Sequence, residues 1–164
     1  FLFNRIFRQF KSISTDTIAT TDIEPVIAAC RNMSQSKTGA LIVIKRNNSL
    51  EFVKSSGDAM SVAVNQPILE SIFYKNSPLH DGAMLIEGNI ITATRVILPV
   101  SDDKKIPLRF GLRHRAAVGV SEKSDAVCLV VSEENGQISY LKDGDFVLYE
   151  TLEQLTEIIH KDLS

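Results

Sequence analysis

The segment Gly39-Ala40-Leu41-Ile42-Val43-Ile44 is a continuous apolar run, and the polar segment Lys45-Arg46-Asn47-Asn48 follows it directly. An apolar run without polar alternation is typical of a strand that is covered on both faces, and the polar residues after it indicate a turn. We therefore expect a fully buried strand over residues 39–44. Residues 50–53 are expected to return from the turn as its paired strand.

Apolar residues elsewhere in the chain repeat at helical or strand spacing. Helices are predicted over residues 23–33, 67–76, 110–120 and 152–163. Strands are predicted over residues 83–86, 90–100, 126–131 and 137–141, with hairpin turns at Gly88-Asn89 and Glu134-Asn135-Gly136. Because helices and strands interleave while two hairpins break strict alternation, we expect an α/β fold with a mixed central β-sheet flanked by helices.

Length and composition narrow the class of protein. The 164 residues are enough for one globular domain with a sizeable core. The formal net charge of −2 exerts no general attraction on nucleic acid, so no nucleic-acid partner is expected and any anion site must be local. The chain contains no apolar run of about 18 residues, the length that a transmembrane helix needs. Cys30 and Cys128 lie in apolar stretches and are expected to be buried thiols, as in a reduced, cytosolic setting.

The N-terminal residues differ in character from the rest. Residues 1–11 mix aromatic side chains with Arg and Lys, and residues 12–21 are rich in Ser and Thr. The first segment is either a juxtamembrane segment or a helix that packs on the surface of its own domain, because both are basic and amphipathic. We assign residues 1–20 to a juxtamembrane and linker segment and residues 21–164 to one domain.

A first candidate for chemistry is the loop Ser77-Pro78-Leu79-His80-Asp81-Gly82-Ala83, which places an imidazole and a carboxylate between Pro and Gly. A carboxylate at the entrance to a strand can hold a hard divalent cation that bridges phosphate oxygens, or it can help to deprotonate a hydroxyl. The alternative is an Asp-Gly turn with a solvated carboxylate.

A second candidate is Gly111-Leu112-Arg113-His114-Arg115-Ala116, near a predicted helix start. Side chains and free backbone N–H groups at a helix N-terminus can surround one anion, and Arg suits bidentate contact with phosphate. The alternative is a solvated basic turn. A third segment, Ser132-Glu133-Glu134, could bind phosphate through Ser132 and support a metal or a base through a glutamate, or it could be a charged hairpin turn.

In this order and spacing, the three segments and residues 37–44 resemble the diadenylate cyclase domain over roughly residues 22–164. The resemblance is to the membrane-anchored subtype, whose transmembrane helices would lie upstream of Phe1 and hold the domain at the cytoplasmic face of the cell membrane. It implies that residues 21–164 are a catalytic domain that condenses two ATP molecules into cyclic di-AMP and two pyrophosphates. Each protomer would hold one ATP, so catalysis would need a homodimer.

The resemblance also implies roles for individual residues. Asp81 would hold Mn²⁺ or Mg²⁺ and activate the 3′-hydroxyl, with His80 and one glutamate, assigned as Glu134, assisting at the metal. Arg113, His114 and Arg115 would grip the phosphates and complete the catalytic set with Asp81. The remaining ATP-binding positions would be Gly82, Ala83, Leu98, Leu112, Ala116, Ser132 and Glu133.

Two positions depart from the family pattern. Leu112 stands where the family usually has Thr, and its side chain cannot form a hydrogen bond with phosphate or bind a metal. Ile97 stands where this subtype often places Tyr beside the adenine, so it offers packing without aromatic stacking. An alternative function is therefore a catalytically weak or inactive ATP-binding regulatory module of the same fold. A third is a scaffold domain whose N-terminal segment recruits a partner or a membrane.

Overall fold

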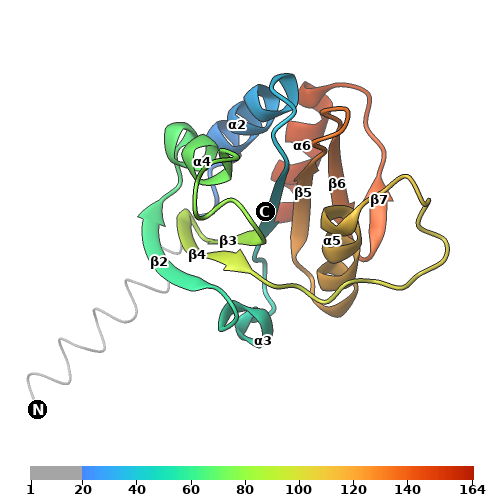
Figure 1. Ribbon diagram of the computed structural model, residues 1–164, viewed down its shortest axis with the longest axis horizontal. Coiled ribbons are helices and arrows are strands. Elements are labelled where there is room, and N and C mark those ends of the chain that lie inside the picture. The colour runs from blue at the N-terminus through green and yellow to red at the C-terminus, as the bar shows by residue number, and fades with distance from the viewer. Residues whose placement is uncertain (1–19) are drawn as a thin grey trace, which may run out of the picture.

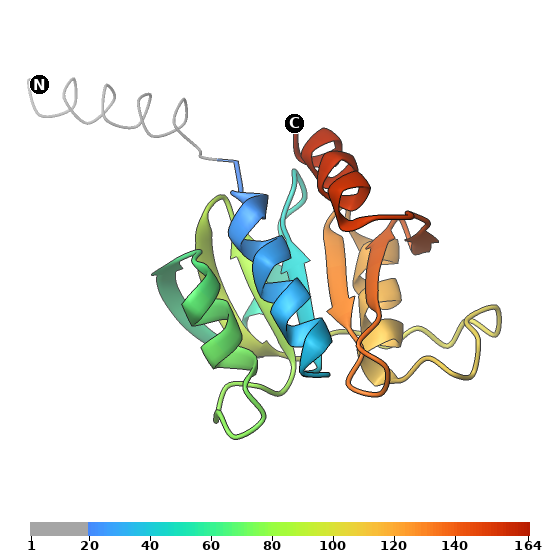
Figure 2. The ribbon, with the colours of Figure 1, turned by 90° about the horizontal axis from the view of Figure 1, so that it is seen from above.

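The computed structural model describes residues 20–164 as a seven-stranded sheet with helices on both faces (Figures 1 and 2). The strand order is β2-β4-β3-β1-β5-β6-β7. The strands are β1 (Ala40–Ile44), β2 (Asp58–Ala63), β3 (Ala83–Glu87), β4 (Ile90–Val96), β5 (Val127–Val131), β6 (Ile138–Lys142) and β7 (Asp145–Val147). The helices are α2 (Ile23–Gln35), α3 (Glu51–Lys54), α4 (Gln66–Phe73), α5 (Leu112–Lys123) and α6 (Leu152–Leu163).

Strand β1 is the middle strand of the sheet, and all five of its residues are buried, as its sequence predicts. It pairs in parallel with β3, where Ile42 is opposite Met84, and antiparallel with β5, where Ile42 is opposite Leu129. Its alternate side chains enter two separate cores. One core lies under α2, α4 and α6, and the other lies under α3 and α5. The predicted mixed α/β fold is confirmed.

The expectation of a strand over residues 50–53 is wrong, because Glu51–Lys54 forms the short helix α3. Leu50 and Val53 are both buried in the core under α5. Residues three apart share one face of a helical turn but point to opposite faces of a strand, so the helical turn buries both. The partners of β1 are instead β3 and β5. The strand β2, which pairs antiparallel with β4, was not predicted from the sequence.

The strand predicted over residues 90–100 ends early, at Val96. Arg95 has φ of 54°, a left-handed conformation that interrupts a strand, and the pairing of β4 with both neighbours shifts register. Pro99 lies just beyond and has no N–H for the ladder. The chain therefore leaves the sheet here, and the loop over residues 97–111 swings out beside α5 and β7 (Figure 1).

Helix α5 packs closely against this loop at Gly119. Only glycine permits this approach, because a Cβ at this position would lie 1.9 Å from the carbonyl oxygen of Pro99. The backbone N–H of Ser101 also donates to the carbonyl of Arg115 (3.1 Å). The loop and the first turns of α5 therefore form one packed unit. This unit makes one wall of the site described below.

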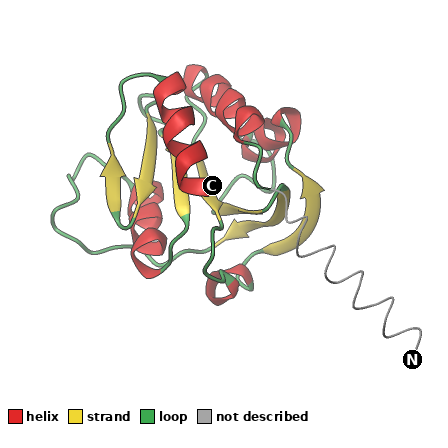
Figure 3. Cartoon of the chain, turned by 180° about the vertical axis from the view of Figure 1, so that it is seen from behind, coloured by secondary structure: helices red, strands yellow, loops and turns green. Residues whose placement is uncertain are grey.

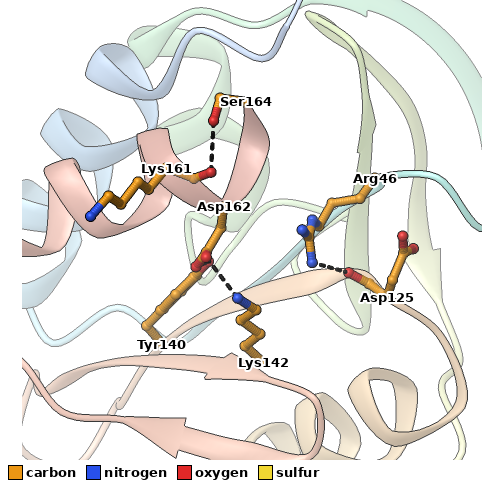
Figure 4. A network of polar contacts seen from close by, with 7 residues as sticks. All are labelled: Arg46, Asp125, Tyr140, Lys142, Lys161, Asp162 and Ser164. Atoms are coloured by element: carbon orange, nitrogen blue, oxygen red, sulfur yellow. Dashed lines mark hydrogen bonds and ion pairs between the residues drawn. The ribbon is translucent and has the colours of Figure 1, made fainter.

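Polar contacts join α6 to the sheet (Figure 4). Asp162 accepts hydrogen bonds from the Tyr140 hydroxyl and the Lys142 ammonium, each at 2.7 Å. These two bonds and the charge of Lys142 hold the pKa of Asp162 below its usual value despite partial burial. The same view shows a guanidinium N–H of Arg46 donating to the backbone carbonyl of Asp125 (3.3 Å).

The two cysteines, Cys30 and Cys128, are free and buried, as predicted, and burial raises the pKa of Cys30 to about 12. Seen from behind, α6 and α2 lie on the same side of the sheet (Figure 3). Within residues 20–164, no helix has both the length and the apolar character needed to span a bilayer. The segment predicted over residues 1–11 and nearly all of the Ser/Thr-rich linker lie outside the described residues.

Candidate nucleotide site

A cavity of about 640 Å³ opens at the end of the sheet where β1 and β3 begin and β4 and β5 end. Four segments far apart in the sequence form its walls. They are the Asp81-Gly82 loop, residues 96–100 after β4, residues 109–116 at the start of α5, and residues 131–137 after β5. The cavity has the size of sites that hold one drug-sized or nucleotide-sized ligand.

Asp81 lies in the loop that precedes β3, and its side chain is 83% exposed. The neighbouring His80 ring lies beside it, with Nε2 3.3 Å from Oδ1 of Asp81. Nδ1 of the same ring is 2.7 Å from the carbonyl oxygen of Ser77, which can only accept, so Nδ1 carries a proton. The Ser77 contact therefore fixes the orientation of the ring and leaves Nε2 next to the carboxylate. Together the two side chains offer one nitrogen and one oxygen donor to a cation.

Gly82 fixes the position of this loop against β4. Its φ of +79° is left-handed, and a Cβ would lie 2.9 Å from the Cα of Arg95. A side chain at this position would be excluded by both the conformation and the space. The close approach brings Asp81 next to the wall made by Val96, Ile97 and Leu98.

The three consecutive residues of the basic motif point to different surroundings. Arg113 lines the cavity, and its Nη1 lies 3.6 Å from Oε2 of Glu133. Arg115 does not line the cavity, and its Nη2 donates instead to the carbonyl of Ile106 (3.5 Å). Three successive side chains on a helix diverge by about 100° each, which separates these roles.

His114 is only 6% exposed and packs against Phe110, with ring centroids 4.7 Å apart. Burial, with a smaller contribution from the charge of Arg113, lowers the pKa of His114 to about 4. The imidazole is therefore neutral at physiological pH. Its Nε2 has no hydrogen-bond partner among residues 20–164. His114 lines the cavity as a neutral group and contributes no positive charge to it.

Ser132, Glu133 and Glu134 lie on the opposite wall, in the turn between β5 and β6. The Ser132 hydroxyl oxygen accepts from the backbone N–H groups of Glu134 (3.2 Å) and Asn135 (3.4 Å). These bonds leave the hydroxyl proton available to an acceptor in the cavity.

The structure thus brings most of the predicted site residues to one cavity. Those that line it are Asp81, Gly82, Leu98, Leu112, Arg113, His114, Ala116, Ser132, Glu133 and Glu134. Three predicted residues do not line it: His80 lies beside Asp81 but outside the lining, Arg115 faces the 97–111 loop, and Ala83 is buried within β3.

Comparison with known proteins identifies the fold and the family of this chain. Residues 27–146 match the DAC family model, described as DisA bacterial checkpoint controller nucleotide-binding. The chain is 45% identical over 124 residues to the diadenylate cyclase CdaS of Bacillus thuringiensis, covering 76% of this chain and 61% of that protein. The crystal structure of DacA from Staphylococcus aureus (N166C/T172C double mutant) superposes with a TM-score of 0.83 at 41% identity, covering 86% of this chain and 94% of that one.

This chain belongs to the diadenylate cyclase (DAC) domain family. The resemblance inferred from the sequence is confirmed. A structure of a hypothetical membrane spanning protein from Bacillus cereus is also similar, with a TM-score of 0.76 and 42% identity over 80% of this chain and 65% of that one. This chain spans between 51% and 61% of the length of the Bacillus and Listeria relatives that it matches.

Sequence reasoning missed one cation of the DAC domain. The Arg109 guanidinium lies 4.7 Å from the centroid of the Phe110 ring, and both side chains line the cavity. Arg109 has no carboxylate within ion-pair distance in the described part of the chain. Arg109 was not predicted as a site residue because it follows a polar surface loop. Its position two residues before the Gly111 motif could have indicated that it lies near the cavity.

The charges that line the cavity of the DAC domain are nearly balanced. The carboxylates are those of Asp81, Glu133 and Glu134, and the guanidiniums are those of Arg109 and Arg113. With His114 neutral, the carboxylates outnumber the cations by one. A divalent cation beside Asp81 would offset this excess and add positive charge favourable to a phosphate.

Proposed function

We propose that this DAC domain condenses two ATP molecules into cyclic di-AMP with release of two pyrophosphates. The observation that carries the proposal is that Asp81 and Arg113, from different elements, line one cavity of nucleotide size. A carboxylate for the attacking hydroxyl and a guanidinium for the phosphates are the two groups that this reaction needs. The names of the relatives support the same activity.

The reaction needs two half-sites. One cavity of about 640 Å³ accommodates one ATP, and each 3′-hydroxyl must attack the α-phosphorus of the other nucleotide. A bond forms from each 3′-oxygen to phosphorus, the bond to the bridging oxygen breaks, and pyrophosphate leaves with that electron pair. Two protomers that face each other through their cavities place the two reactants in contact.

The cavity rim supports a homodimer. Ile97, Val100 and Leu112 line the cavity and are nevertheless 72%, 46% and 74% exposed. Large apolar side chains that remain exposed around a site are typical of a surface that another protein covers. A second copy of the domain would cover these side chains and exclude water from the reacting groups.

Asp81 acts at the attacking hydroxyl, where its carboxylate accepts the proton. Asp81 and His80 would also hold a divalent cation, Mn²⁺ or Mg²⁺, with phosphate oxygens and water as the remaining ligands. When bound, such a cation would neutralise charge on the phosphates and on the departing pyrophosphate. Within residues 20–164, no three His, Cys, Asp or Glu side chains converge on one point, so a role for Glu134 at the metal stays a prediction.

Arg113 and Arg109 provide the positive charge that the chain itself offers to the phosphates, and Ser132 provides a hydroxyl donor. The nucleoside would lie against an apolar wall formed by Leu98, Ile97 and Gly82.

We assign the catalytic domain to residues 21–164. We further propose that it belongs to a membrane-anchored parent whose catalytic domain faces the cytosol. The similarity to the hypothetical membrane spanning protein from Bacillus cereus supports this assignment.

Incubation with ATP and Mn²⁺ or Mg²⁺, followed by chromatographic identification of cyclic di-AMP, tests this function. We expect product formation whose specific activity rises with protein concentration, because two copies must meet. Absence of product across metals and protein concentrations would contradict the proposal, as would full activity in Asp81→Ala.

Leu112 favours a second candidate, a regulatory module that binds ATP without turnover. This residue begins α5, lines the cavity and has no polar atom in its side chain. Under this alternative the wild type binds ATP, and Leu112→Thr restores turnover.

A further inference from the structure

Gly39 stands immediately before β1, and the space beside it is filled by the side chain of Arg113. A Cβ built on Gly39 would lie 2.6 Å from Nη1 and 2.7 Å from Cζ of that guanidinium. Both distances are well below van der Waals contact for such atoms, which is about 3.5–4 Å. The guanidinium thus occupies the volume that any side chain at position 39 would need.

The backbone does not require glycine at this position. Gly39 is absent from the residues with positive φ, whereas Gly82 has φ of +79° and needs glycine for its conformation. The absence of a side chain at position 39 therefore serves the neighbouring group and not the local chain. Glu133, whose Oε2 lies 3.6 Å from Nη1 of Arg113, contacts the same guanidinium.

We propose that Gly39 is a positioning residue that sets how deeply the Arg113 guanidinium lies in the cavity and so aims it at the nucleotide phosphates. The proposal rests on the proposed function for the identity of the ligand. Arg113 has a long side chain with many rotamers, and its side chain is only 25% exposed. Holding the Arg113 side chain in one arrangement before the ligand arrives reduces the side-chain entropy that is lost when phosphate binds.

The substitution Gly39→Ala separates positioning from stability. The methyl group meets only the far end of a flexible side chain, so the guanidinium moves by about 1 Å while the backbone stays in place. Alanine also lowers the entropy of the unfolded chain at a compatible position. We therefore expect an unchanged melting temperature together with a displaced Arg113.

The experiment is a double-mutant cycle on the whole chain with Gly39→Ala, Arg113→Ala and the double variant. Calorimetry measures binding of a non-hydrolysable ATP analogue and of adenosine, and chromatography measures the rate of cyclic di-AMP formation. We expect Gly39→Ala to weaken binding of the ATP analogue about tenfold, which is the size of effect that a misplaced charged contact gives. Adenosine binding should not change, and Gly39→Ala should have no further effect on the Arg113→Ala background.

Thr38→Ala is the matched control, because it alters the adjacent residue without adding an atom near Arg113. It should bind the ATP analogue as the wild type does. The proposal is overturned if Gly39→Ala binds the analogue normally, if it weakens adenosine equally, or if its effect persists without Arg113. A wild type that binds the analogue but makes no product refutes the proposed cyclase function and leaves the cycle to decide on Gly39. A wild type that does not bind the analogue refutes both.

Discussion

Nε2 of His80 lies 3.3 Å from Oδ1 of Asp81, while Nδ1 of the same ring lies 2.7 Å from the Ser77 carbonyl oxygen. The Ser77 contact orients the imidazole, and the imidazole in turn places Nε2 beside the carboxylate. A carboxylate that is 83% exposed contributes little to folding and is accessible to a ligand.

Asp81→Asn should reduce cyclic di-AMP formation by at least ~100-fold, because the amide keeps the shape but can neither accept the hydroxyl proton nor hold a cation as an anion. Its melting temperature should match that of the wild type. His80→Ala should have a smaller effect, about tenfold in the apparent affinity for Mn²⁺, as expected for a supporting ligand. Rate measurements across a Mn²⁺ titration check both variants. Equal losses at saturating Mn²⁺ for the two variants would contradict this division of roles.

His114 should make folding stability depend on pH. Its pKa is about 4 in the folded protein and about 6.5 when exposed, so the unfolded chain binds a proton more readily between these values. The stability contribution is complete above pH 6.5 and is lost as pH falls toward 4, by about 3 kcal/mol. Urea unfolding of the wild type and His114→Gln at several pH values measures the effect. The difference between the two proteins should shrink with falling pH in this window, and a constant difference would show that the ring does not titrate as buried.

Leu112→Thr should raise the rate of product formation without loss of ATP affinity. Leu112 is 74% exposed at the first position of α5, so threonine fits there without clash and adds a hydroxyl facing the cavity. One hydrogen bond to a charged group is worth roughly 1.5–3 kcal/mol, or about tenfold to a hundredfold if it acts in the transition state. Single-turnover rates of the two proteins decide the point. Leu112→Val, which adds no polar atom, is the control and should not be faster than the wild type.

Arg109→Ala should raise the KM for ATP several-fold and leave the melting temperature unchanged. The guanidinium lies over the Phe110 ring and has no carboxylate partner among residues 20–164, so its charge is available to phosphate. Lys104→Ala removes an exposed charge from the same loop outside the cavity and serves as the control. Steady-state kinetics at two salt concentrations measure both variants. Equal changes in KM would indicate a general charge effect instead of a specific contact.

Gly119→Ala should destabilise the fold, in contrast to Gly39→Ala. Its Cβ would lie 1.9 Å from the carbonyl oxygen of Pro99, and a backbone atom cannot move aside as a guanidinium can. We expect a loss of about 1–3 kcal/mol in the free energy of unfolding, as for other overpacked positions. Chemical denaturation of the two alanine variants compares the effects directly. A Gly119→Ala variant as stable as the wild type would show that the 97–111 loop is not packed on α5.

Several elements were predictable because their signal is local. The apolar run of β1, the turn between β3 and β4 and the spacing of α6 each contain their own pattern within a few residues. The strand predicted over residues 50–53 was wrong because Leu50 and Val53, three residues apart, are both buried in the same core, which a helical turn allows and a strand does not. Their burial is evident only from the neighbouring core. The short edge strand β7 was also missed, because its three residues, one exposed and two half-buried, are too few to carry a pattern.

The sequence by itself determined the chemistry that is available: an Asp-Gly loop, a pair of arginines around a histidine, and a Ser-Glu-Glu turn, in the order typical of the DAC family. Only the tertiary structure decided which of these groups meet. Consecutive residues on a helix diverge by about 100°, so Arg113 enters the cavity, His114 becomes a neutral buried ring and Arg115 turns to the Ile106 carbonyl. Gly39 lies beside Arg113 because a strand distant in sequence packs against the start of α5, and no local pattern encodes that packing.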